Sequence, residues 1–235
     1  MVSRAAVRGF IASIVLTLAP VLPSSADAAP VVVTGGQSTI TLDAEVLASG
    51  GLTLVGTGPF IMQIAPRDAN EFPTTFAYDT EDFDATASGK IDHFGQIQVS
   101  PSDPEVFVPI ESVTIFRDRS REGSLGGKAS GYFVQNNPVV GPVIDLFDLA
   151  TFDTLSAGET ALTIEADLLI APEFAAFLLE NGLTTTDLSG ADAGEIRVDA
   201  EASVIPLPPA AGAAALTFVA LGFKRAARIK RLSNQ

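Results

Sequence analysis

The chain has 235 residues, with 14 Lys and Arg against 28 Asp and Glu, and therefore a formal net charge of −14. It contains no Cys and a single His. This composition excludes a disulfide scaffold, a thiolate nucleophile, Cys-based metal motifs and a two-His metal site. The excess of acid also argues against nucleic acid as a partner, because a phosphate-binding surface needs a surplus of Lys and Arg.

The N-terminus has the three parts of a secretory signal peptide. Arg4 and Arg8 precede an uncharged, mostly apolar stretch, and Ala26-Asp27-Ala28 follows it. Signal peptidase recognises this small-x-small pattern. An N-terminal membrane anchor is the alternative, but the apolar stretch is shorter than the ~20 residues that a span needs. We expect residues 1–28 to be a signal peptide cleaved after Ala28, with Ala26 and Ala28 as the recognised residues.

Residues 29–204 form the region expected to fold, with seven basic residues against 27 acidic ones and a formal charge of −20. Charged and apolar residues alternate at 195–201 and again at 162–168, which is typical of a strand with one face in water. Short runs between Gly, Pro, Asn and Asp predict further strands. These are 31–34, 38–42, 52–57, 60–64, 74–78, 88–91, 96–100, 106–116 and 131–134.

One short helix interrupts this β pattern. Pro172 is suited to the first helical position, Phe174, Phe177 and Leu178 lie on one face, and Asn181-Gly182 predicts the end. The fold class expected from these elements is mainly β: a single antiparallel β-sandwich-like domain with one short helix.

The C-terminus predicts a hydrophobic helix followed by a basic tail. No charged residue occurs from Ser203 to Phe223, and prolines at 206, 208 and 209 confine the helix to about Ala210–Phe223. A basic cluster then follows, and by the positive-inside rule it would stay in the cytoplasm. The basic tail consists of Lys224, Arg225, Arg228, Lys230 and Arg231. We expect residues 205–235 to be a C-terminal sorting signal with a transmembrane helix.

The residues Ile205, Pro206, Leu207 and Pro208, followed by a Gly/Ala/Leu-rich stretch and a basic end, resemble a PEP-CTERM sorting signal of the VPLPA variant. Ile205 stands where Val is usual, and Pro209 where Ala is usual. The resemblance implies a Gram-negative exporter and an exosortase in the inner membrane. It also implies a destination at the cell surface or in the matrix, often together with exopolysaccharide and biofilm production.

The central region resembles HtaA-like exported β domains. The resemblance covers most of residues 38–202 and implies an exported β domain, some relatives of which bind haem. It depends on the following segments: Thr41-Leu42-Asp43, Gly58, Phe72-Pro73, residues 89–95, Leu146-Phe147-Asp148-Leu149 and residues 162–182.

Two ligand sites are open alternatives. His93 could ligate haem with Tyr78 or Tyr132 assisting, or it could be a structural or surface His between two strands that the neighbouring Asp92 holds charged more often. Asp79, Glu81, Asp82 and Asp84 could supply oxygen ligands to calcium. Solvated charge in a surface loop of an acidic protein explains the same four residues.

Catalysis is the third alternative. A carboxylate pair could hydrolyse a polysaccharide, but the sequence does not select one pair among 27 carboxylates. The motif Gly-x-Ser-x-Gly does not occur. The run 117–122 and the Gly-rich segment 123–127 predict an exposed hairpin tip rather than a phosphate-binding loop.

The sequence therefore predicts a non-enzymatic, exported cell-surface or extracellular-matrix protein, with a ligand-binding module as the alternative and a hydrolase third. No catalytic residue, metal ligand or cofactor is assigned. The expected partners are signal peptidase, an exosortase and the inner membrane, with exopolysaccharide as a candidate.

Overall fold

The computed structural model describes residues 29–55, 58–70, 72–101, 108–138 and 141–206. The strands are β1 (Val31–Leu42), β2 (Leu52–Val55), β3 (Phe60–Ile64), β4 (Ala77–Tyr78), β5 (Lys90–Pro101), β6 (Val108–Arg117), β7 (Ala129–Asn136), β8 (Asp145–Ala150), β9 (Thr154–Ala157), β10 (Ala161–Ile170) and β11 (Asp192–Val204). The helices are α1 (Ala44–Ser49), α2 (Phe83–Thr86), the 3-10 turn η1 (Arg119–Arg121), α3 (Ser124–Gly127) and α4 (Pro172–Glu180).

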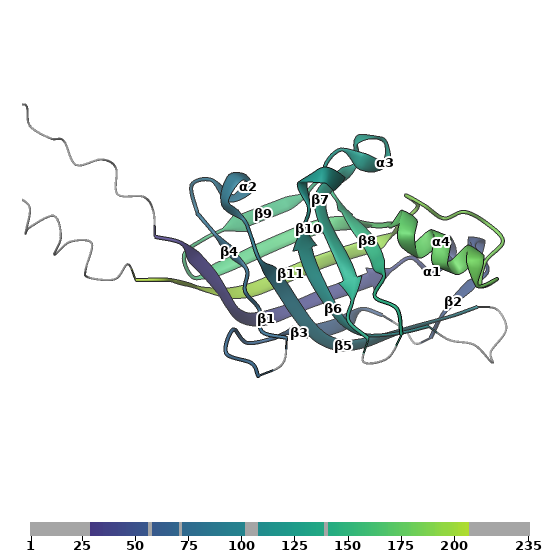
Figure 1. Ribbon diagram of the computed structural model, residues 1–235, viewed down its shortest axis with the longest axis horizontal. Coiled ribbons are helices and arrows are strands. Elements are labelled where there is room, and N and C mark those ends of the chain that lie inside the picture. Colours follow the sequence, from purple (N-terminus) through teal and green to yellow (C-terminus); the bar gives the residue numbers. More distant parts are fainter. Residues whose placement is uncertain (1–28, 56–57, 71, 102–107, 139–140, 207–235) are drawn as a thin grey trace, which may run out of the picture.

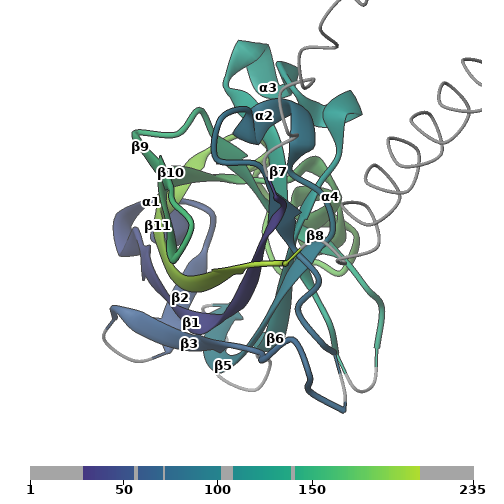
Figure 2. The ribbon, with the colours of Figure 1, turned by 90° about the vertical axis from the view of Figure 1, so that its left-hand side faces the viewer.

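Eight antiparallel strands close into a barrel. They follow the order β11, β1, β3, β5, β6, β7, β8 and β10, and the pairing of β10 with β11 completes the ring (Figures 1 and 2). Three short strands pair antiparallel with strands of the barrel: β2 with β5, β4 with β1, and β9 with β10. The mainly β prediction is confirmed, but a closed barrel replaces the predicted sandwich. Inward and outward residues alternate in both folds, so the pattern alone does not distinguish them.

The first strand is longer than the sequence indicated. β1 is continuous where two strands were predicted, with a register shift between Val33 and Gly35. Beside this shift, Gly36 has a φ of +119°, and a Cβ there would lie 2.3 Å from the carbonyl oxygen of Asp199 on β11, so the close approach of the two strands requires glycine. β5 likewise joins two predicted strands, with a register shift between Phe94 and Ile97. A β-bulge thus takes the place of each predicted break.

One core cluster lies within the barrel. An aromatic group lies on one side of it, and its ring centroids are 5.1–6.5 Å apart. This group contains Phe76, Tyr78, Phe83, Tyr132 and Phe152. The aliphatic part of the core includes Val33, Ile40, Met62, Ile91, Ile115, Val134, Leu162, Ile164, Ile196 and Val198. Because each inward residue is followed by an outward one, most charged side chains remain on the outer surface.

The predicted helix is confirmed as α4. It starts with Pro172, buries Phe174 and Leu178, and packs the Phe174 ring edge-on against Phe147 of β8 at 6.0 Å. The shorter helices were not predicted. Asp43 and Asp82 cap α1 and α2 by accepting backbone N–H hydrogen bonds, which is the usual role of Asp before a helix.

The two ends of the barrel chain lie side by side. Val31 at the start of β1 pairs with Val204 at the end of β11, and the Ile205 N–H donates to the Pro30 carbonyl at 2.9 Å (Figure 1). Residues 1–28 and 207–235 lie outside the described residues. The predicted signal peptide, the helix from Ala210 to Phe223 and the basic tail belong to these two segments. Within the described ranges, no helix is long and apolar enough to cross a membrane.

Candidate functional site

His93 is a core residue. It lies on β5, is 1% exposed, and its Nε2 is 2.8 Å from the buried Ser38 hydroxyl of β1. Burial lowers the pKa of His93 to about 4, against a smaller opposing effect of the backbone at Ile91 and Val113. The imidazole is therefore neutral at neutral pH. It would have to leave the core to ligate an external haem.

The other residues of the haem alternative are not gathered around His93. Asp92 points to the opposite face of β5, where its carboxylate is 2.7 Å from Lys90 Nζ. The expectation that Asp92 holds His93 charged is therefore wrong. The Tyr78 hydroxyl donates to the Gly158 carbonyl at 2.6 Å. Among the described residues, no hydrogen bond joins His93 to Tyr78 or Tyr132.

The acidic residues at 79–84 hold local turns. Asp79 accepts from the Glu81 N–H at 2.7 Å, and Asp82 accepts from the Ala85 N–H at 3.2 Å. The part of the chain that the structure describes contains no group of three or more His, Cys, Asp or Glu arranged to hold a metal ion. This segment is a capped turn leading into α2.

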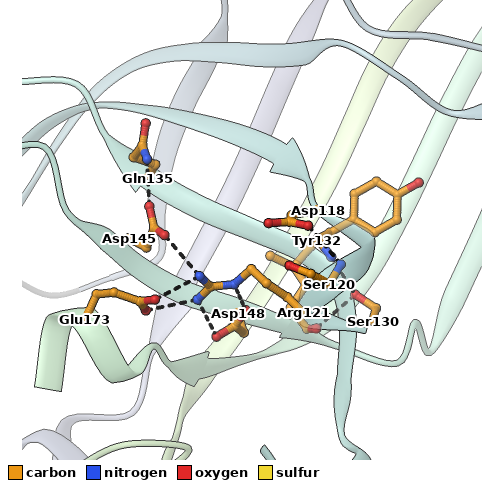
Figure 3. Close-up of polar contacts among 10 residues, drawn as sticks. Asp118, Ser120, Arg121, Ser130, Tyr132, Gln135, Asp145, Asp148 and Glu173 are labelled. Carbon is orange, nitrogen blue, oxygen red and sulfur yellow. Dashed lines mark hydrogen bonds and ion pairs between the residues drawn. The ribbon is translucent and has the colours of Figure 1, made fainter. Parts of the chain in front are cut away.

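Arg121 is the centre of a polar cluster that the sequence did not reveal (Figure 3). Its guanidinium donates to both carboxylate oxygens of Asp148 at 2.7 and 2.9 Å and to Asp145 at 3.0 Å. It also donates to both oxygens of Glu173 at 3.1 Å and lies over the Phe133 ring, 4.8 Å from its centroid. We call these four charged residues the Arg121 cluster.

The predicted exposed hairpin tip is confirmed as the mostly exposed connection between β6 and β7, and the Arg121 cluster holds one side of it against the barrel. Arg121 belongs to η1, Asp145 and Asp148 to β8, and Glu173 to the first turn of α4. Burial acts to raise the pKa of Glu173, but the hydrogen bonds and charge of Arg121 outweigh it and leave that pKa below its usual value. Asp148 is 1% exposed and needs this partner. Because these residues are far apart in the sequence, no local pattern could predict the cluster.

A cavity of about 380 Å³ lies on the outer face of β1, β10 and β11, with three carboxylates in its lining: Asp153, Glu165 and Glu195. Arg197 also lines it and is ion-paired with Glu165 and Asp199. Burial and the charges of Asp192, Asp153 and Glu195 raise the pKa of Asp167, which lies close by. The structure thus gathers carboxylates here, but ion pairs already engage Glu165.

A second cavity, of about 510 Å³, lies beside α2, α3 and β7. Its lining includes Asp84, Arg117, Glu122, Tyr132, Phe152 and Leu155. Tyr132 was considered from sequence only as an assistant to His93. We call this space the Tyr132 cavity.

Two of the four predicted sorting residues fall within the described chain. Ile205 continues directly from β11 and Pro206 is the last described residue. Leu207, Pro208 and the predicted signal-peptide residues Ala26 and Ala28 lie outside the described ranges.

No family model and no curated protein matches the chain. Among solved structures, the chain is similar to the crystal structure of the C-terminal domain of HtaA from Corynebacterium glutamicum. The sequence identity is 17%, the TM-score is 0.45, and the match covers 74% of this chain and 99% of that one. The chain is thus weakly similar to an HtaA domain, and this distant likeness says nothing of its activity.

Proposed function

We propose that this chain is an exported, non-enzymatic protein of the cell surface or extracellular matrix of a Gram-negative bacterium. A signal peptidase acts at Ala28, and an exosortase-type enzyme acts on the segment that begins at Ile205. The acidic barrel is the part delivered, in association with exopolysaccharide.

The pairing of the first and last strands is the observation that supports this proposal. Because Val31 lies opposite Val204, Ala29 and Pro206, the first and last described residues, lie at the same end of the barrel. Both terminal segments can therefore be handled at one membrane without crossing the fold. The opposite end of the barrel, with α1 and α4, then faces away from that membrane (Figure 1).

The buried state of His93 favours the surface-protein proposal over a haem module centred on that residue. A haem ligand must present its nitrogen to a cofactor from outside, whereas His93 Nε2 is engaged with Ser38 inside the core. The acidic residues at 79–84 likewise accept backbone N–H bonds.

Fractionation of a tagged full chain in an exosortase-containing Gram-negative host tests the proposal. The tag is inserted after Gly182, where a glycine with open space around it lies at an exposed turn away from the Tyr132 cavity. We expect the intact chain in the cell-surface or extracellular fraction. Deletion of residues 205–235 should change that location.

A matched variant separates the sorting motif from the basic tail. Pro206→Ala combined with Pro208→Ala keeps the tail and alters the motif, and it should leave the chain in the inner membrane. The same host without its exosortase should give that result with the unaltered chain. Cytoplasmic retention of the full chain, or an unchanged location after deletion of 205–235, contradicts the proposal.

A further inference from the structure

The Tyr132 cavity contains two buried hydrogen-bond donors that lack acceptors. Tyr132 is 1% exposed, and within the described structure its hydroxyl has no hydrogen-bond partner of acceptable geometry. Arg117 Nε is also buried, and it too has no hydrogen-bond partner of good geometry within the described structure. Burial raises the pKa of Tyr132 to about 12, and the charge and hydrogen bonding of the adjacent Arg117 act against that rise. A guanidinium can only donate, so the hydroxyl proton of Tyr132 has no described acceptor, and buried polar groups normally have one.

Arg117 lies directly against Tyr132. Its guanidinium carbon is 5.1 Å from the centre of the phenol ring, and its Nη1 donates to the backbone carbonyl of Asp84 at the start of α2. No described residue accepts a hydrogen bond from Nη2. No described carboxylate lies against the edge of the guanidinium formed by Nε and Nη2, and this edge matches the two oxygens of a carboxylate.

Among the described residues, Arg117 differs from Arg121 and Arg197 in its lack of a bound carboxylate. The folded region carries 27 carboxylates against seven basic residues, and the clusters around Arg121 and Arg197 show how readily Arg finds them. Yet over the described ranges Arg117 forms no ion pair with a carboxylate. Arg119, beside it, bonds to the backbone carbonyls of Asp84 and Ala85. Asp84 and Glu122 line the same cavity and balance its positive charge, but the guanidinium of Arg117 holds no described carboxylate and can take one from a ligand.

The rest of the lining suits a sugar ring. Phe152 is half-buried, with its ring 5.1 Å from that of Tyr132, and Leu155 is 39% exposed. These side chains form an apolar wall. The exposed carboxylates of Asp84 and Glu122 lie on the same cavity and can accept hydrogen bonds from hydroxyl groups.

We propose that the Tyr132 cavity binds an acidic sugar, a uronic acid residue of a polysaccharide. Its carboxylate is held by the Nε–Nη2 edge of Arg117 and by the Tyr132 hydroxyl, and its ring lies against Phe152 and Leu155. Both donors are beneath the surface without ligand, so the Arg117 side chain rotates as the carboxylate enters. That the sugar belongs to a matrix polysaccharide rests on the proposed function, whereas the chemistry of the site does not.

Calorimetric titration of the purified full chain tests this inference. The protein is kept in a zwitterionic detergent, because sugar-headed detergents would compete for the site. The probes are a uronic acid disaccharide and the neutral disaccharide of the same linkage. We expect the acidic probe to bind at least ten times more tightly than the neutral one, and its binding to weaken as salt is raised.

Three variants locate the binding. Tyr132→Phe keeps every ring contact and removes only a buried hydroxyl whose proton has no described acceptor, so it should weaken binding of the acidic probe at least tenfold without lowering the melting temperature. Arg117→Gln should weaken binding to a similar extent. Arg197→Gln makes the same charge change at the other cavity and should bind as the unaltered chain does.

The inference is overturned if the acidic probe does not bind, if the neutral probe binds equally well, or if Tyr132→Phe and Arg117→Gln both retain binding. The result is distinct from the test of export. Binding with cytoplasmic location would reject the proposed function alone, and surface location without binding would reject the sugar site alone.

Discussion

At the scale of single residues, the lone His is the feature whose role the structure decides. His93 follows Ile91 at a spacing of two, and both are buried on the inner face of β5. Strand alternation could have placed His93 inward. It could not supply Ser38, which lies 55 residues away in the sequence. The sequence favoured a structural role over a ligand role, but it could not show the partner that holds His93 in the core.

His93 should make the barrel less stable in mild acid. Its folded-state pKa of about 4 lies below the ordinary value of 6.5, so the unfolded chain takes up a proton first as the pH falls. The contribution of His93 to the stability of the fold is fully present above pH 6.5 and is lost as the pH drops toward 4. We expect the unfolding free energy to fall by about 2 kcal/mol between pH 7 and pH 5 from this residue, as measured by urea unfolding with circular dichroism.

His93→Gln is the control for this effect. Gln cannot take up a proton, so the variant should lack the His93 component of the pH dependence, whatever its stability at pH 7. An unchanged slope between pH 7 and pH 5 in His93→Gln would show that other groups cause the acid sensitivity.

At the scale of elements, the contact between β1 and β11 depends on glycine. Gly194 has φ +131°, and a Cβ there would lie 2.0 Å from the Thr41 carbonyl oxygen. Gly194→Ala should therefore destabilise the barrel by at least about 2 kcal/mol, from backbone strain and displacement of β1. Gly123 has a positive φ of +72° with open space around it, so Gly123→Ala should cost only about 1 kcal/mol. Equal losses in urea unfolding would contradict this account of close approach.

The Arg121 cluster joins η1 to β8 and α4. Arg121→Gln leaves the buried Asp148 without its charged partner, and we expect the unfolding free energy to fall by roughly 3–5 kcal/mol. Glu173→Gln removes a partner whose side chain is 48% exposed and should cost less than about 1 kcal/mol. If urea unfolding gives similar losses for both variants, Asp148 does not depend on Arg121 as its geometry indicates.

Local signals predicted the elements better than the contacts between them. Pro172 and the apolar face of Phe174 and Leu178 identified α4, and alternation identified β10 and β11. β8 was missed because its inner four residues are all buried, Asp148 included, so it does not alternate. The Tyr132 cavity is built from α2, β6, β7 and the start of β9, and no local pattern links those segments.

At the scale of the whole molecule, the closure of the sheet into a barrel could not be predicted from the sequence. It depends on the pairing of β10 with β11 while β11 also pairs with β1. One strand that alternates charged and apolar residues serves equally well in a sandwich or a barrel. The pairing of β1 with β11 also brings the two ends of the barrel chain together. The central claim is that the intact barrel is delivered outside the cell.

The most direct test of that claim is the intact mass of the chain recovered from outside the cells of an exosortase-containing host. We predict a polypeptide that begins at Ala29 and retains the complete barrel through Val204. A chain that is found only in the cytoplasm, with the mass of all 235 residues, would contradict the account.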